Sequence, residues 1–319
     1  MLRYVLRRIL WLIPVIICVS FIIYTLLSLA PGTIVDKMIT DSTTQAELQE
    51  IMAKYDLDKP MVYRYAKYMW GLLQGDLGTS QITGSSVWQS FIARLPNTLW
   101  LALASLVIGV GLSLPLGILA AKYSSTIWDN LTTGFTLIGM SMPSFWLGLL
   151  LLRWFSLDFK IFPAGGNAGL KSFVLPAITS GLMLMAMVTR QTRSAMLEVL
   201  HSDYLRTARA KGVPEKSVIR VHALGNAWIP IITTIGNVLS RTLAGQAIVE
   251  SVFSWPGIGR LTIEAVEQRD VTLACGCVIL TSIIYVLLLL LVDIMYAVVD
   301  PRIRAQYQGT KKSKKAVMA

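Results

Sequence analysis

Long runs of hydrophobic residues alternate with short polar segments along most of this chain. Six of these runs are long enough to form transmembrane helices, because a helix needs roughly 20 apolar residues to cross the hydrocarbon layer of a bilayer. They occupy residues 9–29, 97–121, 131–155, 172–190, 227–249 and 271–299. With 54% hydrophobic and 15% charged residues, the chain of 319 residues is too apolar for a water-soluble fold. The pattern predicts an all-α, polytopic membrane protein with six transmembrane helices.

Charged residues are distributed unevenly over the segments that join these runs. Seventeen Lys and Arg against five Asp and Glu occur in residues 1–8, 122–130 and 190–222 and after residue 299, whereas the intervening segments together are close to neutral. Membrane proteins keep positive charge on the cytoplasmic side, so both termini are predicted inside the cell. The net charge of +11 is then a signal of topology. It favours the lipid bilayer as partner and excludes nucleic acid, which would require basic residues interleaved with aromatic ones on a soluble face.

The longest polar connection lies between the first two runs and is expected outside the cytoplasm. Residues 42–47 have the composition of a helix start. Residues 61–73 form an amphipathic run with four aromatic residues, as in helices that lie at a membrane interface. The aromatic residues are Tyr63, Tyr65, Tyr68 and Trp70. Two interpretations remain open: the segment caps the outer helix ends, or it contacts an extracytoplasmic partner.

Small residues recur every four positions along the second run. They are Ser105, Gly109, Ser113, Gly117 and Ala121. Such faces let membrane helices approach closely, so we expect this stripe to be a helix-packing surface.

Proline also occurs in or beside five of the runs, at Pro14, Pro115, Pro143, Pro176 and Pro230. Prolines bend helices, and a bent bundle can enclose a cavity, as a transporter requires.

Few side chains in the apolar runs are ionisable or could bind a metal. Arg241 is costly within a membrane and should face protein or water. It could line a pathway and attract a substrate carboxylate, pair with a neighbouring subunit, or extend outward to the surface. The cysteines, Cys18, Cys275 and Cys277, lie in apolar runs and are interpreted as packing residues. No metal site is predicted from them or from His201 and His222.

A polar, basic island separates the fourth and fifth runs. It consists of Asp203, Tyr204, Leu205, Arg206, Thr207, Ala208, Arg209, Ala210, Lys211 and Gly212. Leu205, Ala208 and Gly212 recur at helical spacing, which predicts a short amphipathic helix that ends near the glycine. Pro214 then begins a second helix. The island is either a docking surface for a partner or a solvated loop near anionic lipids.

The island also carries a resemblance to a known family. Residues 203–212, together with His222-Ala223-Leu224, resemble the cytoplasmic EAA loop of ABC-transporter permease subunits of the dipeptide/oligopeptide/nickel importer family. Arg206-Thr207-Ala208 stands where that motif has Glu-Ala-Ala, and Gly212 matches its glycine. Further segments are similar, in order and spacing, to the B-type permease half of this family. They are residues 1–4, 58–60, 75–78, 94–99, 141–146, 252–260, 269–270 and 300–304.

The resemblance implies an ABC importer type I permease fold and a division of the chain. The parts are an N-terminal transmembrane helix (1–30), an extracytoplasmic region (31–95), a five-helix transmembrane domain (96–300) and a basic cytoplasmic tail (301–319). The coupling loop lies within the third part, at residues 191–225, where residues 203–212 and His222 would contact an ATPase. Candidates for an outer gate or pathway are Arg241, Trp255, Pro256, Gly257 and Gly259. A merely structural connector is the alternative for the last four.

The resemblance also implies partner subunits and a function for this chain. The chain has no Gly-x-x-x-x-Gly-Lys-Ser/Thr loop that could hold phosphates, so catalytic residues and cofactors are not expected in it. Two ABC ATPase subunits, a homologous C-type permease and an extracytoplasmic substrate-binding protein would join it in the inner or plasma membrane of a bacterium or archaeon. The expected function is half of the translocation pathway for di- or oligopeptides. A nickel or metallophore importer, and an ATP-independent channel or secondary carrier, remain as alternatives.

Overall fold

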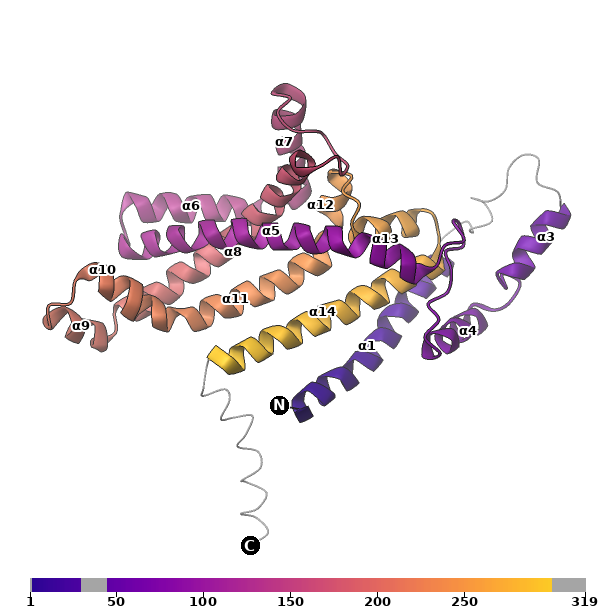
Figure 1. Ribbon diagram of the computed structural model, residues 1–319, viewed down its shortest axis with the longest axis horizontal. Coiled ribbons are helices and arrows are strands. Elements are labelled where there is room, and N and C mark those ends of the chain that lie inside the picture. Colours follow the sequence, from indigo (N-terminus) through magenta and orange to yellow (C-terminus); the bar gives the residue numbers. More distant parts are fainter. Residues whose placement is uncertain (1, 30–44, 300–319) are drawn as a thin grey trace, which may run out of the picture.

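Helices packed side by side organise the chain (Figure 1). The computed structural model describes residues 2–29 and 45–299. The first helices along the chain are α1 (Leu2–Leu29), α3 (Gln45–Lys54), α4 (Met61–Leu73) and α5 (Val87–Lys122). The central helices are α6 (Ile127–Ser141), α7 (Ser144–Leu152), the π-helical turn η1 (Arg153–Asp158) and α8 (Leu170–Leu200). The remaining ones are α9 (Asp203–Ala210), α10 (Glu215–Ser217), the π-helical turn η2 (Val218–Ala223), α11 (Leu224–Gly245), α12 (Ala247–Val252), α13 (Ile258–Glu267) and α14 (Val271–Val299).

Five helices in the described part of the chain are long and apolar enough to cross a membrane. They are Leu10–Leu29, Val87–Lys122, Leu170–Leu200, Glu215–Ser240 and Val271–Val292. These correspond to the first, second, fourth, fifth and sixth predicted runs. The third run, 131–155, is not one helix. It is divided between α6 and the pair α7–η1, which are bent by 100° relative to each other. Residues 2–29 and 45–299 therefore contain up to six candidate spans, if this bent pair counts as one.

Pro143 explains the bend. Met142 and Pro143 have extended backbone, with ψ of 125° and 140°. The ring of a proline disfavours helical backbone at the preceding residue, and its nitrogen cannot donate a helical hydrogen bond. A new helix begins directly afterwards, because the Pro143 carbonyl accepts hydrogen bonds from the amides of Trp146 and Leu147 (both 3.1 Å). The other four prolines noted in the apolar runs lie within helices; they are Pro14, Pro115, Pro176 and Pro230.

The fifth run also ends differently from its prediction. It was expected to continue to residue 249, but α11 ends at Gly245 and α12 begins at Ala247. Gln246 forms the junction between them. The side chains of Arg241 and of residues 243–245 lie outside the described part of the structure.

The largest helix–helix contact joins α5 and α8. The small-residue stripe of α5 lies in this contact, and its five members are all buried. A Cβ atom added at Gly109 would lie 2.4 Å from Leu184 Cδ2, and one at Gly117 would lie 2.6 Å from Thr192 Cβ. The two backbones therefore approach too closely for larger side chains, which is how helices associate where the hydrophobic effect is weak.

Gly117→Val is expected to destabilise the bundle because its side chain would push α8 away from α5. Overpacking of this kind costs typically 1–3 kcal/mol. The measurement is the midpoint of thermal unfolding of the protein purified in detergent. Gly111→Val is the control, since a Cβ there meets nothing within 4 Å. Equal midpoints for the two variants would contradict the close approach.

The amphipathic run at residues 61–73 forms α4, with the predicted bounds, and packs on α1. Tyr65 provides the contact: its hydroxyl donates to the Ile17 carbonyl (3.0 Å) and lies 3.0 Å from Ser20 Oγ. The rings of Phe21 and Tyr24 meet the Tyr65 ring edge-on, at 5.2 and 5.4 Å between centroids. The helix α3 begins at Gln45, so residues 42–44 of the predicted helix start lie outside the described residues.

The arrangement of the short helices gives the molecule two distinct ends. Figure 1 shows α9 and α10 at one end of the long helices, and α3 and α4 at the opposite end. α7 projects away from the bundle, and α13 lies near the start of α5. The helices α9 and α10 are therefore separated from α3 and α4 by the length of the bundle, as expected for segments on opposite sides of a membrane.

Candidate functional site

The island folds as the helix α9, at the end of the bundle that the charge pattern predicts to be cytoplasmic; we call it the inner end. Leu205 is its inward residue and is completely buried. Ala208 and Val213 pack beside it against the same hydrophobic cluster. Asp203, Arg206, Thr207, Arg209, Ala210 and Lys211 are exposed, and Tyr204 is partly so. The helix therefore has one apolar face that holds it to the bundle and one basic face that is free.

Gly212 ends this helix in a left-handed conformation, with φ of +76°. The amide of Gly212 donates to the Arg209 carbonyl (2.9 Å), and the amide of Val213 donates to the Ala208 carbonyl (3.2 Å). This pair of bonds is a Schellman motif, which satisfies the last carbonyls of a helix and favours glycine at its left-handed position. The glycine therefore sets the length of α9 and turns the chain toward α10.

Two side-chain contacts fix the loop on either side of α9. Arg209 donates to both oxygens of Glu215, at 3.1 Å from Nε and 3.0 Å from Nη2. These bonds raise the pKa of the Arg209 guanidinium above its ordinary value. Asn226 Nδ2 donates to the Tyr204 hydroxyl (2.9 Å) and to the His222 carbonyl (3.1 Å), and the His222 side chain is exposed. The loop is thus preformed, because its two arms are tied together and to α11.

The cluster that receives Leu205 extends far into the bundle; we call it the inner cluster. Its buried members are Ala121, Leu184, Val188, Ala195, Met196, Leu205, Val218, Ile219, Ala223, Ala227, Ile231 and Val238. Leu205 thus belongs to one continuous apolar core with Leu184 of α8 and Val238 of α11. Protein interiors are densely packed and transmit displacement. A push on α9 would therefore be transmitted to α8 and α11.

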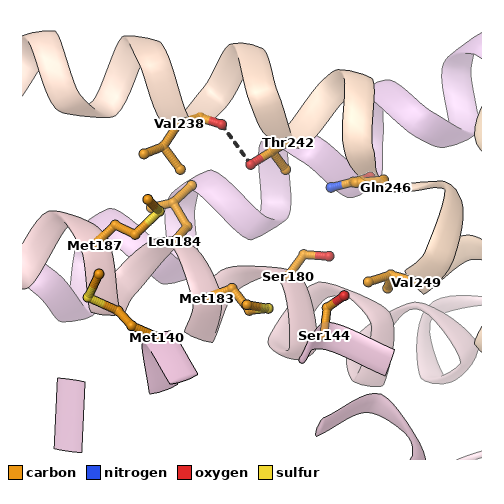
Figure 2. A pocket seen from close by; sticks show the side chains of 10 residues that line it. All are labelled: Met140, Ser144, Ser180, Met183, Leu184, Met187, Val238, Thr242, Gln246 and Val249. Atoms are coloured by element: carbon orange, nitrogen blue, oxygen red, sulfur yellow. Dashed lines mark hydrogen bonds between the residues drawn. The ribbon is translucent and has the colours of Figure 1, made fainter. Parts of the chain in front are cut away.

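A cavity of about 320 Å³ lies at the other end of the inner cluster. It is lined by Met140, Ser144, Ser180, Met183, Leu184, Met187, Val238, Thr242, Gln246 and Val249. Figure 2 shows these side chains converging from the α6–α7 junction, from α8, from α11 and from the α11–α12 junction. Leu184 and Val238 belong to both the cavity wall and the inner cluster. The volume lies within the range of ligand pockets, roughly 300–1,000 Å³.

The segment Trp255–Gly259, which we call the outer turn, joins α12 to α13 and includes the first two residues of α13. Trp255 is buried against Leu101, Ala177 and Phe173, with its ring 5.5 Å from the Phe173 ring. Its indole nitrogen donates to the Asn97 carbonyl (3.2 Å), and Asn97 Nδ2 donates to the Pro256 carbonyl (2.8 Å). The turn is therefore fastened to the start of α5.

The buried carboxylate of Glu250 organises this turn. Its Oε1 accepts a hydrogen bond from Thr98 Oγ1 (2.7 Å) and its Oε2 accepts one from the Arg260 amide (3.0 Å). The Ile258 amide donates to Thr98 Oγ1 (2.8 Å). A Cβ atom at Gly257 would lie 2.1 Å from Glu250 Oε1. The carboxylate thus takes the space that a side chain at residue 257 would need.

The predicted coupling residues and the predicted gate residues lie in two separate places. Residues 203–212 and His222 gather at the inner end, whereas Trp255, Pro256, Gly257 and Gly259 gather in the outer turn. A Cβ atom at Gly259 would lie 2.4 Å from Ala247 Cα, so this glycine allows α12 and α13 to meet. None of these four residues lines the cavity of Figure 2. The side chain of Arg241 lies outside the described residues, so its predicted role stays a prediction.

Two residues of the outer region were missed by the sequence analysis. Glu250 is an acid within the apolar segment 247–253, and that isolated charge was the available signal. Gln246 carried no comparable signal, because glutamine is common at exposed positions of helices and nothing in its neighbourhood marks it as buried.

Comparisons with known proteins identify the family to which this chain is similar. Residues 113–305 match the family described as "Binding-protein-dependent transport system inner membrane component", and residues 1–102 match its N-terminal component. The dipeptide transport system permease protein DppB of Escherichia coli (strain K12) is 36% identical, over 95% of this chain and 99% of that protein. The oligopeptide transport system permease protein AppB of Bacillus subtilis (strain 168) is 37% identical, with the same shares covered.

Another relative and two solved structures extend the comparison. The glutathione transport system permease protein GsiC of Salmonella paratyphi A is 36% identical over 95% of this chain and 99% of that protein. The inward-facing MetNI methionine ABC transporter has a chain with a TM-score of 0.56 and 18% identity, covering 67% of this chain and 97% of that chain. An amino acid ABC transporter solved with histidines has a TM-score of 0.51 and 20% identity, covering 67% and 94%. At these identities the two structures show the fold alone.

The matched family regions cover both the extracytoplasmic connection and the bundle with its inner loop, and the relatives match over nearly their whole length. The chain belongs to the family of binding-protein-dependent transport system inner membrane components, the permease subunits of ABC importers.

Proposed function

We propose that this chain forms one half of the translocation pathway of an ATP-driven importer for di- or oligopeptides. A homologous C-type permease would form the other half. Two ABC ATPase subunits would bind at the inner end, and an extracytoplasmic binding protein would deliver peptides at the outer end. The cell membrane of a bacterium or archaeon is the expected location.

The free basic face of α9 is the observation that carries this proposal. The helix is held by Leu205 and Ala208 and ended by Gly212, yet its polar and charged side chains are exposed at the end of the bundle. A preformed helix with one free face fits a groove on a partner, as in other helix-in-groove complexes. ATP-driven closure of the ATPases would move α9 and, through the inner cluster, α8 and α11. Binding of ATP would thereby shift the bundle between its inward-open and outward-open states.

Peptides are proposed as substrates because of the relatives. Proteins named for dipeptide and oligopeptide transport match this chain over almost its whole length. A permease named for glutathione, itself a peptide-like thiol, matches at the same level. Nickel or metallophore complexes remain the second candidate within the importer class.

Transport by the reconstituted complex tests the proposal. The chain, its partner permease, the two ATPases and the binding protein are placed in liposomes, and uptake of a labelled dipeptide, a labelled tetrapeptide and nickel is measured with and without ATP. We expect ATP-dependent uptake of peptide. Flux that does not depend on ATP would support a channel or secondary carrier instead. Uptake of nickel without uptake of peptide would replace the proposed substrate class.

A further inference from the structure

Two buried polar side chains lie in the wall of the cavity that Figure 2 shows. Gln246 is 3% exposed and Ser180 is 7% exposed. Neither the Nε2 nor the Oε1 atom of Gln246 has a hydrogen-bond partner, and the same holds for Ser180 Oγ, among the residues that the structure describes. Buried polar groups are paired in the great majority of cases, and each exception requires a reason.

Other hydroxyl groups of α8 and α11 are paired, because they donate to backbone carbonyls one turn earlier in their own helix. Thr242 donates to the Val238 carbonyl one turn earlier (2.8 Å), as the dashed line in Figure 2 shows. Thr179 donates to the Leu175 carbonyl (2.8 Å), and Ser240 donates to the Gly236 carbonyl (3.0 Å). Ser180 lies next to Thr179 but makes no such bond. Its hydroxyl and the Gln246 amide are therefore available to a ligand.

The chemistry of these groups selects a class of ligand. A glutamine amide has both a carbonyl acceptor and an NH₂ donor, so it can pair with both the N–H and the C=O of a peptide group. All ten described residues that line the cavity are uncharged. The described wall therefore offers hydrogen bonds to a neutral main chain, without a charge for a terminal carboxylate or ammonium group.

Three methionine side chains contribute to the apolar part of the cavity wall. Met140, Met183 and Met187 line it together, from the α6–α7 junction and from α8. Methionine side chains are flexible and polarizable, and they adapt to apolar groups of different shape. A wall of three methionines suits a site that must accept many side chains.

We propose that the permease itself contacts the transported peptide in this cavity. Gln246 and Ser180 would hydrogen-bond to the peptide main chain, and Met140, Met183 and Met187 would accommodate varied side chains. This assignment rests on the proposed function and adds to it a step of selection within the membrane, after delivery by the binding protein. Because Leu184 and Val238 link the cavity wall to the inner cluster, movement of α9 would change the shape of the site.

Gln246→Leu tests the main-chain contact, since it keeps a side chain of similar size and removes both hydrogen-bonding atoms. In the reconstituted complex we expect the initial rate of uptake of labelled dialanine, below saturation, to fall about tenfold. Gln268→Leu is the matched control. Gln268 is exposed at the end of α13, so this variant should transport at the wild-type rate.

A backbone-modified substrate makes the test specific. Dialanine that is methylated on its peptide nitrogen lacks the N–H group that would donate a hydrogen bond to Gln246 Oε1. The wild-type complex should transport dialanine faster than its N-methylated form, and Gln246→Leu should reduce this ratio by at least about threefold. The binding protein is the same in both complexes, so its own preference cancels when the two ratios are compared. Ser180→Ala, a smaller change, should lower dialanine uptake about threefold and serves if Gln246→Leu does not fold.

The outcomes separate the two proposals. If the wild-type complex imports peptide and both Gln246→Leu and Ser180→Ala leave the rate and the ratio unchanged, the site assignment is wrong while the proposed function stands. If the wild-type complex imports no peptide, the proposed function fails, and the assignment of a peptide site fails with it.

Discussion

Arg206→Glu is expected to stop ATP-driven import while the protein remains folded in the membrane. Arg206 is exposed on the free face of α9 and makes no contact with the inner cluster, so reversing its charge should leave Leu205 in place. Charge reversal within an interface opposes association, because like charges brought together cost several kcal/mol. Each 1.4 kcal/mol lowers binding about tenfold. We therefore expect uptake to fall by more than about tenfold and the ATPase subunits to be lost on co-purification.

Lys216→Glu provides the control for this effect. Lys216 is also a basic, exposed residue of the inner loop, but it lies on α10, outside the proposed docking helix. The variant carries the same change of net charge, so a general effect of charge on topology or on lipid contact would appear in both proteins. Retention of ATPase binding and import by Arg206→Glu would argue that α9 is not the docking helix.

Gly257→Ala is expected to destabilise the protein, because the buried Glu250 carboxylate occupies the space that the added methyl group would need. The new Cβ would lie 2.1 Å from Glu250 Oε1 and 2.4 Å from Oε2. The carboxylate cannot move aside without breaking its hydrogen bonds to Thr98 Oγ1 and to the Arg260 amide. Overpacking costs typically 1–3 kcal/mol, and loss of a buried hydrogen bond to a charged group adds about 1.5–3 kcal/mol. The thermal unfolding midpoint of the purified protein should fall by several degrees.

A double-mutant cycle separates this clash from other effects of alanine. Glu250→Ala removes the carboxylate and is itself destabilising, because Thr98 and the Arg260 amide lose their acceptor. In that background Gly257→Ala should cost much less, since the space is then empty; such non-additivity is expected for residues in contact. Gly134→Ala is the neutral control, because a Cβ there meets nothing within 4 Å. Additive effects in the cycle would show that Glu250 does not set the requirement for glycine at residue 257.

The predicted fold follows the sequence most closely where a local pattern decides the structure. The amphipathic run 61–73 became α4 with the same bounds, and the island became α9, ended by Gly212. Five of the six apolar runs correspond to helices that can cross a membrane. Periodicity, capping and turn chemistry are properties of adjacent residues, so they can be read along the chain.

The bend at Pro143 shows the limit of that reading. Four other prolines in the apolar runs lie within helices, and the sequence does not distinguish them from Pro143. The hydrophobic pattern continues on both sides of Met142, so it predicts a single helix. Whether a proline bends or breaks a helix depends on what the two halves pack against.

The amino-acid sequence by itself determined the class of protein, the positions of most helices and the amphipathic helix that ends at Gly212. Only the tertiary structure decided which distant residues meet. It brought Glu250 to Thr98 across 152 positions of the chain, and it buried Gln246 beside the methionines of α6 and α8. The physical reason is that hydrophobic pattern and backbone preference act between neighbours in sequence. A cavity and a buried carboxylate, in contrast, depend on close packing between segments that the sequence keeps far apart.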